Sequence, residues 1–231
     1  MKKFLAVLML LCMAFTCAMA DEAAPAPEAK GEGVMTYAEY AAADLYTEVT
    51  VEAYVQATQD WWDNKITVYA QDDMGGYFIY EMVCSEEDAA KLVEGAKIRV
   101  KGEKIEYAGE VEIGTQPTFE ILEGNYVAEA KDMTALLGTE ELISHINQKA
   151  IFKGLKLEKL THKYGEPGDD IYLTFSLNGQ NYDFCVERYL TGPETEVYKT
   201  ACELQVGDVV DVEGFLYWYN GANPHITKIV K

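Results

Sequence analysis

Two short clusters of aromatic residues with polar neighbours are the parts of this sequence best suited to binding chemistry. They are Asp60-Trp61-Trp62-Asp63 and Trp218-Tyr219-Asn220. Aromatic faces stack on flat or ring-shaped ligands, and neighbouring carboxylates and amides accept hydrogen bonds from ligand hydroxyls. Adjacent residues of an extended segment face opposite ways, so we expect one of the two neighbouring tryptophans to be buried.

The residue types that carry out catalysis are sparse. The sequence has three histidines, His145, His162 and His225. Cys185 and His225 could form a nucleophile and base, but both fall in expected strands, where structural roles are more common. Neither a Gly-x-Ser-x-Gly turn nor a glycine-rich phosphate loop occurs. We therefore predict a protein that is not an enzyme and has no cofactor.

Acidic pairs could suggest a calcium site. Asp72-Asp73 and Asp169-Asp170 supply the oxygen ligands that calcium prefers. Their spacing does not match an EF-hand loop, and turn acids of this kind are usually solvated. Neither a Cys-x-x-Cys motif nor a histidine pair at helical spacing is present. We predict no metal site and read these aspartates as solvated hairpin acids.

The charge of the chain bears on its partners. The 231 residues include 39 acidic and 19 basic side chains, for a formal net charge of −20. Half of the residues are apolar, which is enough to build a core. Because phosphate affinity comes from lysine and arginine releasing counterions, we expect nucleic acid to be disfavoured as a partner.

The N-terminus reads as an export segment. Residues 1–20 combine Lys2 and Lys3, a short apolar run and an Ala18-Met19-Ala20 cleavage signal, which is typical of a signal peptide. Residues 21–34 are rich in Ala, Pro, Glu and Gly and are expected to be a flexible acidic linker. We predict export by a bacterium to a secreted, periplasmic or cell-surface location. A lipid anchor at Cys17 is a weaker alternative, since the bulky Phe15 fits poorly.

Removal of the signal peptide leaves three cysteines, Cys84, Cys185 and Cys202. An odd number permits at most one bridge within the chain, and Cys185 with Cys202 is the pair that one domain could form. Nothing resembles a disulfide framework, so we favour three thiols that pack as small apolar groups.

The chain contains an internal repeat. Six positions recur at a constant separation of 112 residues: Leu92, Gly95, Val100, Gly102, Tyr107 and Gly109 match Leu204, Gly207, Val212, Gly214, Tyr219 and Gly221. Each copy is large enough to fold alone. We therefore predict two domains, at residues 35–126 and 127–231.

The order of elements predicts the architecture of each copy. In the first copy, Thr36 and Glu39 form a capping box before a short helix, and Val49 to Gln56 alternate as a strand. Two further strands, a helix that begins after Ser85, and two more strands follow. The second copy repeats this order from Thr139 to Val230. Five strands with a helix between the third and fourth predict an all-β chain of two consecutive OB-fold Greek-key barrels.

Three segments carry a family resemblance. Thr36-Tyr37-Ala38-Glu39-Tyr40, the stretch Gln71 to Tyr77, and the stretch Gly95 to Ile113 resemble secreted bacterial OB-fold modules. Such modules occur in tandem and also beside extracellular nucleases. The resemblance implies the fold over residues 35–231 and says little about the ligand.

An OB-fold binds its ligands on the face of strands two and three and in the flanking loops. The aromatic and amide residues that we place there are Trp61, Trp62, Tyr69, Tyr107, Tyr164, Tyr172, Trp218, Tyr219 and Asn220. We expect these residues to recognise a glycan or a protein or peptide partner. The alternatives are single-stranded nucleic-acid binding and a purely structural assembly role.

Overall fold

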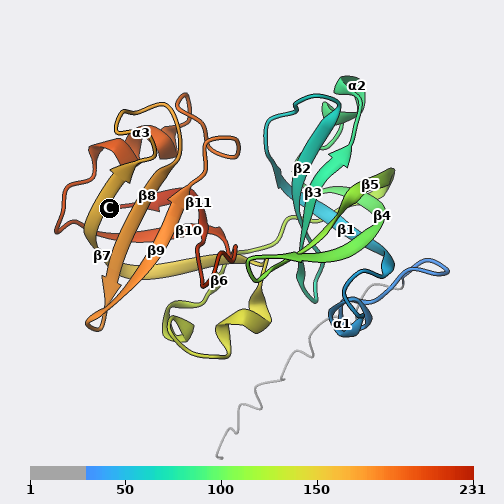
Figure 1. Cartoon of the computed structure of the whole chain (residues 1–231), viewed down its shortest axis with the longest axis horizontal. Helices are drawn as coiled ribbons and strands as arrows, with labels where there is room; N and C mark the ends of the chain where they lie inside the picture. The colour runs from blue at the N-terminus through green and yellow to red at the C-terminus, as the bar shows by residue number, and fades with distance from the viewer. Residues whose placement is uncertain (1–29) are drawn as a thin grey trace, which may run out of the picture.

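The first β region, residues 30–126, is a closed five-stranded barrel of the OB type (Figure 1). The structure is a computed structural model that describes residues 30–231. The strands are β1 (Glu48–Thr58), β2 (Lys65–Gln71), β3 (Gly76–Val83), β4 (Ala96–Tyr107) and β5 (Glu110–Asn125), paired in the closed order β1-β2-β3-β5-β4. Helix α2 (Glu86–Ala89) lies between β3 and β4, as predicted.

Alternating apolar residues build the interior of this barrel. Val49, Val51, Ala53 and Val55 of β1 are all buried, because every second side chain of a strand points to the same face. Helix α1 (Tyr37–Ala42) precedes β1 and has the predicted capping box, in which Thr36 and Glu39 bind each other's backbone N–H groups. The predicted alternation and helix start are therefore confirmed.

The second β region, residues 127–231, is a six-stranded sheet with its own core around Phe152, Phe175 and Phe184. The order is β10-β11-β9-β8-β7-β6, and β10 also pairs with β7. The strands are β6 (Lys131–Asp132), β7 (Lys149–His162), β8 (Ile171–Leu177), β9 (Gln180–Val186), β10 (Val209–Phe215) and β11 (His225–Val230). Helix α3 (Glu196–Glu203) lies between β9 and β10. The interpretation of this sheet as a second OB barrel stays a prediction.

The start of the second region differs from the sequence prediction. We expected a helix from Thr139 to Ile146, but this segment has only one short 3₁₀ turn, η2 (Leu142–His145). Another short 3₁₀ turn, η1 (Thr134–Leu136), precedes it. The turn η2, which lies in this segment, has no side-chain cap on its first N–H groups. Such caps normally favour a full α-helix.

The repeated positions occupy equivalent places in the two regions. Leu92 and Leu204 are both buried at the end of the helical segment. Gly95 and Gly207 follow them with φ values of +89° and +99°, in the left-handed region that favours glycine. The repeated leucine therefore makes an equivalent core contact in each region, and the repeated glycine makes an equivalent turn in each region.

The N-terminal contacts of the barrel begin within the segment that we predicted as a linker. Lys30 Nζ lies 2.8 Å from Asp72 Oδ2, and both side chains are nearly buried. The predictions for a signal peptide, for Cys17 and for most of the linker fall outside the described residues. None of the helices in residues 30–231 has the length and apolar character that a membrane crossing requires.

The two β regions share an aromatic interface, formed by Tyr69, Phe78, Phe215, Tyr217 and His225. The Tyr69 ring stacks on Phe215 with centroids 4.6 Å apart, and His225 stacks on Tyr217 at 4.1 Å. A backbone bond from Asp60 N to Tyr189 O, 2.8 Å long, joins the regions at a second place. Contacts at two separate places fix the spacing between the regions.

Candidate functional site

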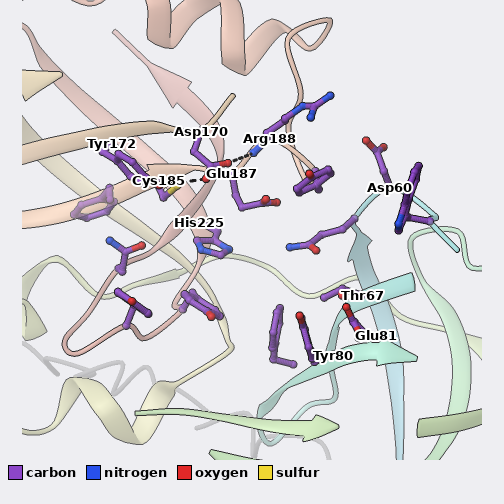
Figure 2. A pocket seen from close by; sticks show the side chains of 18 of the residues that line it. Asp60, Thr67, Tyr80, Glu81, Asp170, Tyr172, Cys185, Glu187, Arg188 and His225 are labelled. Atoms are coloured by element: carbon purple, nitrogen blue, oxygen red, sulfur yellow. Dashed lines mark hydrogen bonds between the residues drawn. The ribbon is translucent and has the colours of Figure 1, made fainter. Parts of the chain in front are cut away.

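A cleft of about 1470 Å³ lies between the two β regions and is lined by both (Figure 2). One wall comes from β2, β3 and the loop after β1, and the other from β7, β8, β9, the start of β11 and the loops after β9 and β10. Its volume exceeds that of ordinary small-molecule pockets. An extended ligand therefore fits this cleft better than a compact one.

Exposed aromatic rings line both walls. Each of them has between 42% and 79% of its surface exposed, and they are Trp62, Tyr80, Tyr172, Tyr189 and Tyr219. An exposed ring in a concave site offers its face to a flat partner group. The cleft therefore provides stacking surfaces from both regions.

Two basic side chains in the cleft form no ion pair with a carboxylate. Nearly all described lysine and arginine side chains form an ion pair with a carboxylate. The exceptions within residues 30–231 are Lys104, Lys131, Lys159 and Arg188. Lys104 is satisfied by three backbone carbonyls, and Lys131 is an exposed neighbour of His145.

Lys159 and Arg188, the other two exceptions, both line the cleft. The Arg188 guanidinium lies 5.1 Å from the centre of the Tyr189 ring. A guanidinium above an aromatic ring keeps its N–H donors available to an anion. Both walls of the cleft therefore carry aromatic rings, and two cations without an ion pair lie among them, in a chain that is strongly acidic overall.

Three of the six carboxylates that line the cleft are already engaged by other side chains. Glu81 pairs with Lys65 at 2.8 Å, and Asp183 accepts a bond from the Thr174 hydroxyl at 2.7 Å. Asp170 pairs with Lys163 at 2.9 Å and accepts from the backbone N–H of Arg188. The net charge of the chain therefore overstates the negative charge that a ligand in the cleft meets.

Cys185 and His225 do not form a catalytic pair. Burial raises the pKa of the Cys185 thiol, and burial lowers the pKa of His225 to about 3. His225 Nδ1 is hydrogen-bonded to the Tyr69 hydroxyl rather than to a thiol. A protonated thiol next to a non-basic imidazole is a poor nucleophile.

Four of the nine predicted ligand residues line the cleft, namely Trp61, Trp62, Tyr172 and Tyr219. As expected for neighbours on an extended segment, the two tryptophans differ. Trp61 is half-buried and donates from Nε1 to the Cys84 carbonyl at 2.8 Å, while 79% of Trp62 is exposed.

Tyr69 was predicted to point outward and contact a ligand, and the prediction of ligand contact is wrong. It does point away from the barrel interior, but it is completely buried in the aromatic interface. The parity of a strand gives the direction of a side chain, whereas the second region decides whether that direction leads to solvent.

The two predicted loops after the fourth strands meet each other. Asn220 N donates to Ala108 O at 2.7 Å, and the Tyr107 and Tyr219 rings lie 6.2 Å apart. Trp218 packs against the second core, and its backbone N–H donates to Glu110. Tyr107, Trp218 and Asn220 therefore lie at a contact between the regions rather than on the cleft walls.

Tyr164 completes the predicted set and lies elsewhere. It is 76% exposed next to Lys163 and does not line the cleft. The sequence reasoning missed Tyr80, Tyr189, Tyr217, Lys159 and Arg188. Of these, Tyr80 could have been found from the sequence, since it shares its strand face with the outward-pointing Phe78.

The predictions for metal and thiol groups have mixed outcomes. Asp72 is not a solvated hairpin acid, because it is buried and bound to Lys30, Tyr77 and two backbone N–H groups. Within residues 30–231, no cluster of His, Cys, Asp and Glu is arranged to hold a metal ion. Cys84, Cys185 and Cys202 are all free thiols, so the Cys185–Cys202 bridge is absent.

No family model matches the chain, and no curated protein matches it. Its resemblance to solved structures is distant. A murine DNA-binding protein bound to double-stranded DNA is 12% identical, with coverage of 79% of this chain and 98% of that one and a TM-score of 0.37. The Ifi202 HINa domain in complex with double-stranded DNA is 10% identical, covering 80% and 100%, with a TM-score of 0.38.

A replication protein A heterotrimer bound to single-stranded DNA is 15% identical, covering 72% of this chain and 43% of that one, with a TM-score of 0.30. The expectation of a glycan or protein partner, with nucleic acid disfavoured by charge, is corrected by these findings. The similar structures bind DNA. The charge argument rested on net charges and did not anticipate that Lys159 and Arg188 line one cleft without an ion pair.

Proposed function

We propose that this chain is a non-catalytic protein that binds single-stranded nucleic acid in the cleft between its β regions. The observation that carries the proposal is the placement of two unpaired cations, Lys159 and Arg188, among the exposed aromatic rings of one cleft. Stacking of bases on aromatic side chains, with cationic groups that contact the backbone, is how single strands are bound without sequence readout.

The contacts across the cleft favour a single strand over a duplex. The bond from Asp60 N to Tyr189 O closes the cleft at one place, and the aromatic interface closes it at another. Unpaired bases present their faces to Trp62 and Tyr219, whereas bases in a duplex are already stacked on each other. Base stacking therefore supplies the affinity that two cations alone cannot.

This proposal includes three expectations about the whole chain. The second β region would be a second OB barrel, which the additional pairing of β10 with β7 supports. The protein would be exported, as the composition of residues 1–20 suggests. It would belong with the secreted tandem OB-fold modules that its sequence resembles.

The test is fluorescence anisotropy with a labelled 12-nucleotide oligothymidylate and a 12-base-pair duplex. We expect binding of the single strand and a loss of affinity of at least tenfold in the double variant Trp62→Ala/Tyr219→Ala, because each stacked base contributes about 1–3 kcal/mol. Tyr164→Ala is the matched control, since Tyr164 is equally exposed but does not line the cleft. Absence of binding at 20 mM salt would overturn the proposal.

Aromatic packing between the two regions favours a second candidate, a structural or assembly role. The aromatic interface buries Tyr69, Phe78 and Phe215 completely or nearly so. A protein with this role would bind neither oligonucleotide, and Trp62→Ala/Tyr219→Ala would change nothing measurable in that assay.

A further inference from the structure

Glu187 is a half-buried carboxylate in the middle of the cleft. It follows β9 directly, next to the unpaired Arg188. Figure 2 shows its side chain pointing into the space between the two walls, between His225 on one side and Asp60 on the other. A ligand that stacks on the rings of both walls therefore passes in front of this group.

The local chain holds this carboxylate in one orientation. Leu190 N donates to Glu187 Oε2 at 2.8 Å, and Thr191 N donates to the Glu187 carbonyl at 2.8 Å. These bonds close a turn over residues 187–191. A carboxylate fixed by its own backbone needs little reorganisation when it binds a ligand.

Glu187 differs from the other carboxylates of the cleft. Glu81, Asp170 and Asp183 are engaged by Lys65, Lys163 and Thr174, respectively. Asp60 and Asp63 are exposed to water. Within residues 30–231, no side chain donates a hydrogen bond to Glu187, so its carboxylate keeps acceptor sites for a ligand.

We infer that Glu187 selects bases with an exocyclic amino group and therefore favours cytosine over thymine in the bound strand. This inference rests on the proposed function. An ionised carboxylate only accepts hydrogen bonds, so it pairs with the N4 amino group of cytosine and is repelled by the O4 carbonyl of thymine. The two pyrimidines have similar stacking faces, so the hydrogen bond decides between them.

The protonation state of Glu187 gives the inference a pH dependence. Burial, followed by the nearby Asp170, raises the pKa of Glu187 to about 7. Above this pH the carboxylate is ionised and prefers amino groups, and below it the preference weakens. Asp170 is paired with Lys163 next to it. Of the other groups around Glu187, His225 has a pKa of about 3 and Tyr172 of about 12, and the pKa values of Lys163, Tyr69, Tyr217 and Cys185 are raised, so these groups do not titrate between pH 6 and 8.

Glu110 and Glu112 lie further away but do titrate in this window, with pKa values of about 8 and about 7. The variant Glu187→Gln separates their effect from that of Glu187. The glutamine keeps the acceptor for Leu190 N but loses the charge. A hydrogen bond to an ionised acceptor is about twice as strong as one to a neutral acceptor.

The experiment compares a 12-nucleotide oligothymidylate with an alternating cytidine–thymidine 12-mer, each at pH 6.5 and pH 8. For the unmodified protein at pH 8, we expect the affinity for the alternating strand to be about fivefold higher than the affinity for oligothymidylate. At pH 6.5 the ratio of these two affinities should be smaller. In Glu187→Gln the ratio of the affinities for the two strands should approach one and should no longer change with pH. Asp183→Asn is the control, because Asp183 lines the same cleft but is bound to Thr174.

The outcomes separate this inference from the function on which it rests. If neither strand binds, the proposed function fails. If both strands bind equally at pH 8, the proposed function stands and the role of Glu187 is overturned. A preference that survives unchanged in Glu187→Gln would also overturn it, since another group would then read the base.

Discussion

The hydroxyl oxygen of Tyr69 lies 2.6 Å from Nδ1 of His225, and this hydrogen bond joins the two β regions inside their shared aromatic interface. Tyr69 belongs to β2 of the first region and His225 to β11 of the second, and both are buried. The bond fixes the position of one cleft wall relative to the other. The shape of the cleft therefore depends in part on Tyr69, which does not itself line the cleft.

Removal of this bond should destabilise the protein. In Tyr69→Phe the His225 ring nitrogen loses its partner in a buried site, which costs about 1–3 kcal/mol. The free energy of unfolding from a urea titration measures this cost. Tyr164→Phe is the control, because its hydroxyl is exposed. Equal stability of the two variants would contradict the prediction.

His225 should make the protein sensitive to acid. Its pKa is about 3 in the folded protein because it is buried, and near 6.5 in an unfolded chain. Between these values the unfolded chain binds a proton that the folded protein does not, so stability falls as the pH falls through this window. We expect the stability advantage of the unmodified protein over His225→Asn to shrink by about 2 kcal/mol between pH 7 and pH 5. A constant difference would contradict this assignment.

Glu110 should have the opposite effect at higher pH. Burial raises its pKa to about 8, and its Oε1 has no hydrogen-bond partner. An unfolded glutamate ionises near pH 4.3, so the folded protein retains a proton that the unfolded chain has lost. The stability from this group is present at low pH and declines as the pH rises from about 4.3 to about 8.

The variant Glu110→Gln tests this decline. Its amide keeps an acceptor for Trp218 N and cannot ionise. We expect it to gain about 4 kcal/mol relative to the unmodified protein between pH 5 and pH 9, as measured by urea unfolding at each pH. Parallel stability curves for the two proteins would show that Glu110 does not titrate in this range.

The two neighbouring tryptophans should respond differently to the same change. Trp61→Phe removes the bond to the Cys84 carbonyl and should cost about 1–3 kcal/mol of stability. Trp62→Phe should leave stability within about 0.5 kcal/mol, because Trp62 is mostly exposed. Thermal and urea unfolding of the pair provides the comparison, and equal losses would contradict the assigned roles.

The three thiols should react in order of accessibility. Cys202 is half-buried, whereas Cys84 and Cys185 are buried, and burial raises the pKa of all three thiols. Alkylation of the folded protein, followed by peptide mass spectrometry, should therefore label Cys202 first. Recovery of a Cys185–Cys202 disulfide peptide from unreduced protein would contradict the free-thiol state.

The sequence by itself determined the local elements and their order. The alternation of Val49, Val51 and Val55 gives β1, Thr36 with Glu39 gives the start of α1, and the repeated glycines give the turns before β4 and β10. These features depend on neighbours within a few residues, so a linear pattern records them. The same reasoning found four of the residues that line the cleft.

Only the tertiary structure decided which of the outward-facing residues are exposed. Tyr69 and Tyr172 both point out of a second strand, yet Tyr69 is buried against Phe215 and Tyr172 lines the cleft. Lys159 and Arg188 are ordinary charges in the sequence, and only the folded chain places both of them on the lining of one cleft without an ion pair. Packing between the two regions sets these differences, through contacts such as Tyr69 with His225, 156 positions apart in the chain, and no local spacing in the sequence carries that information.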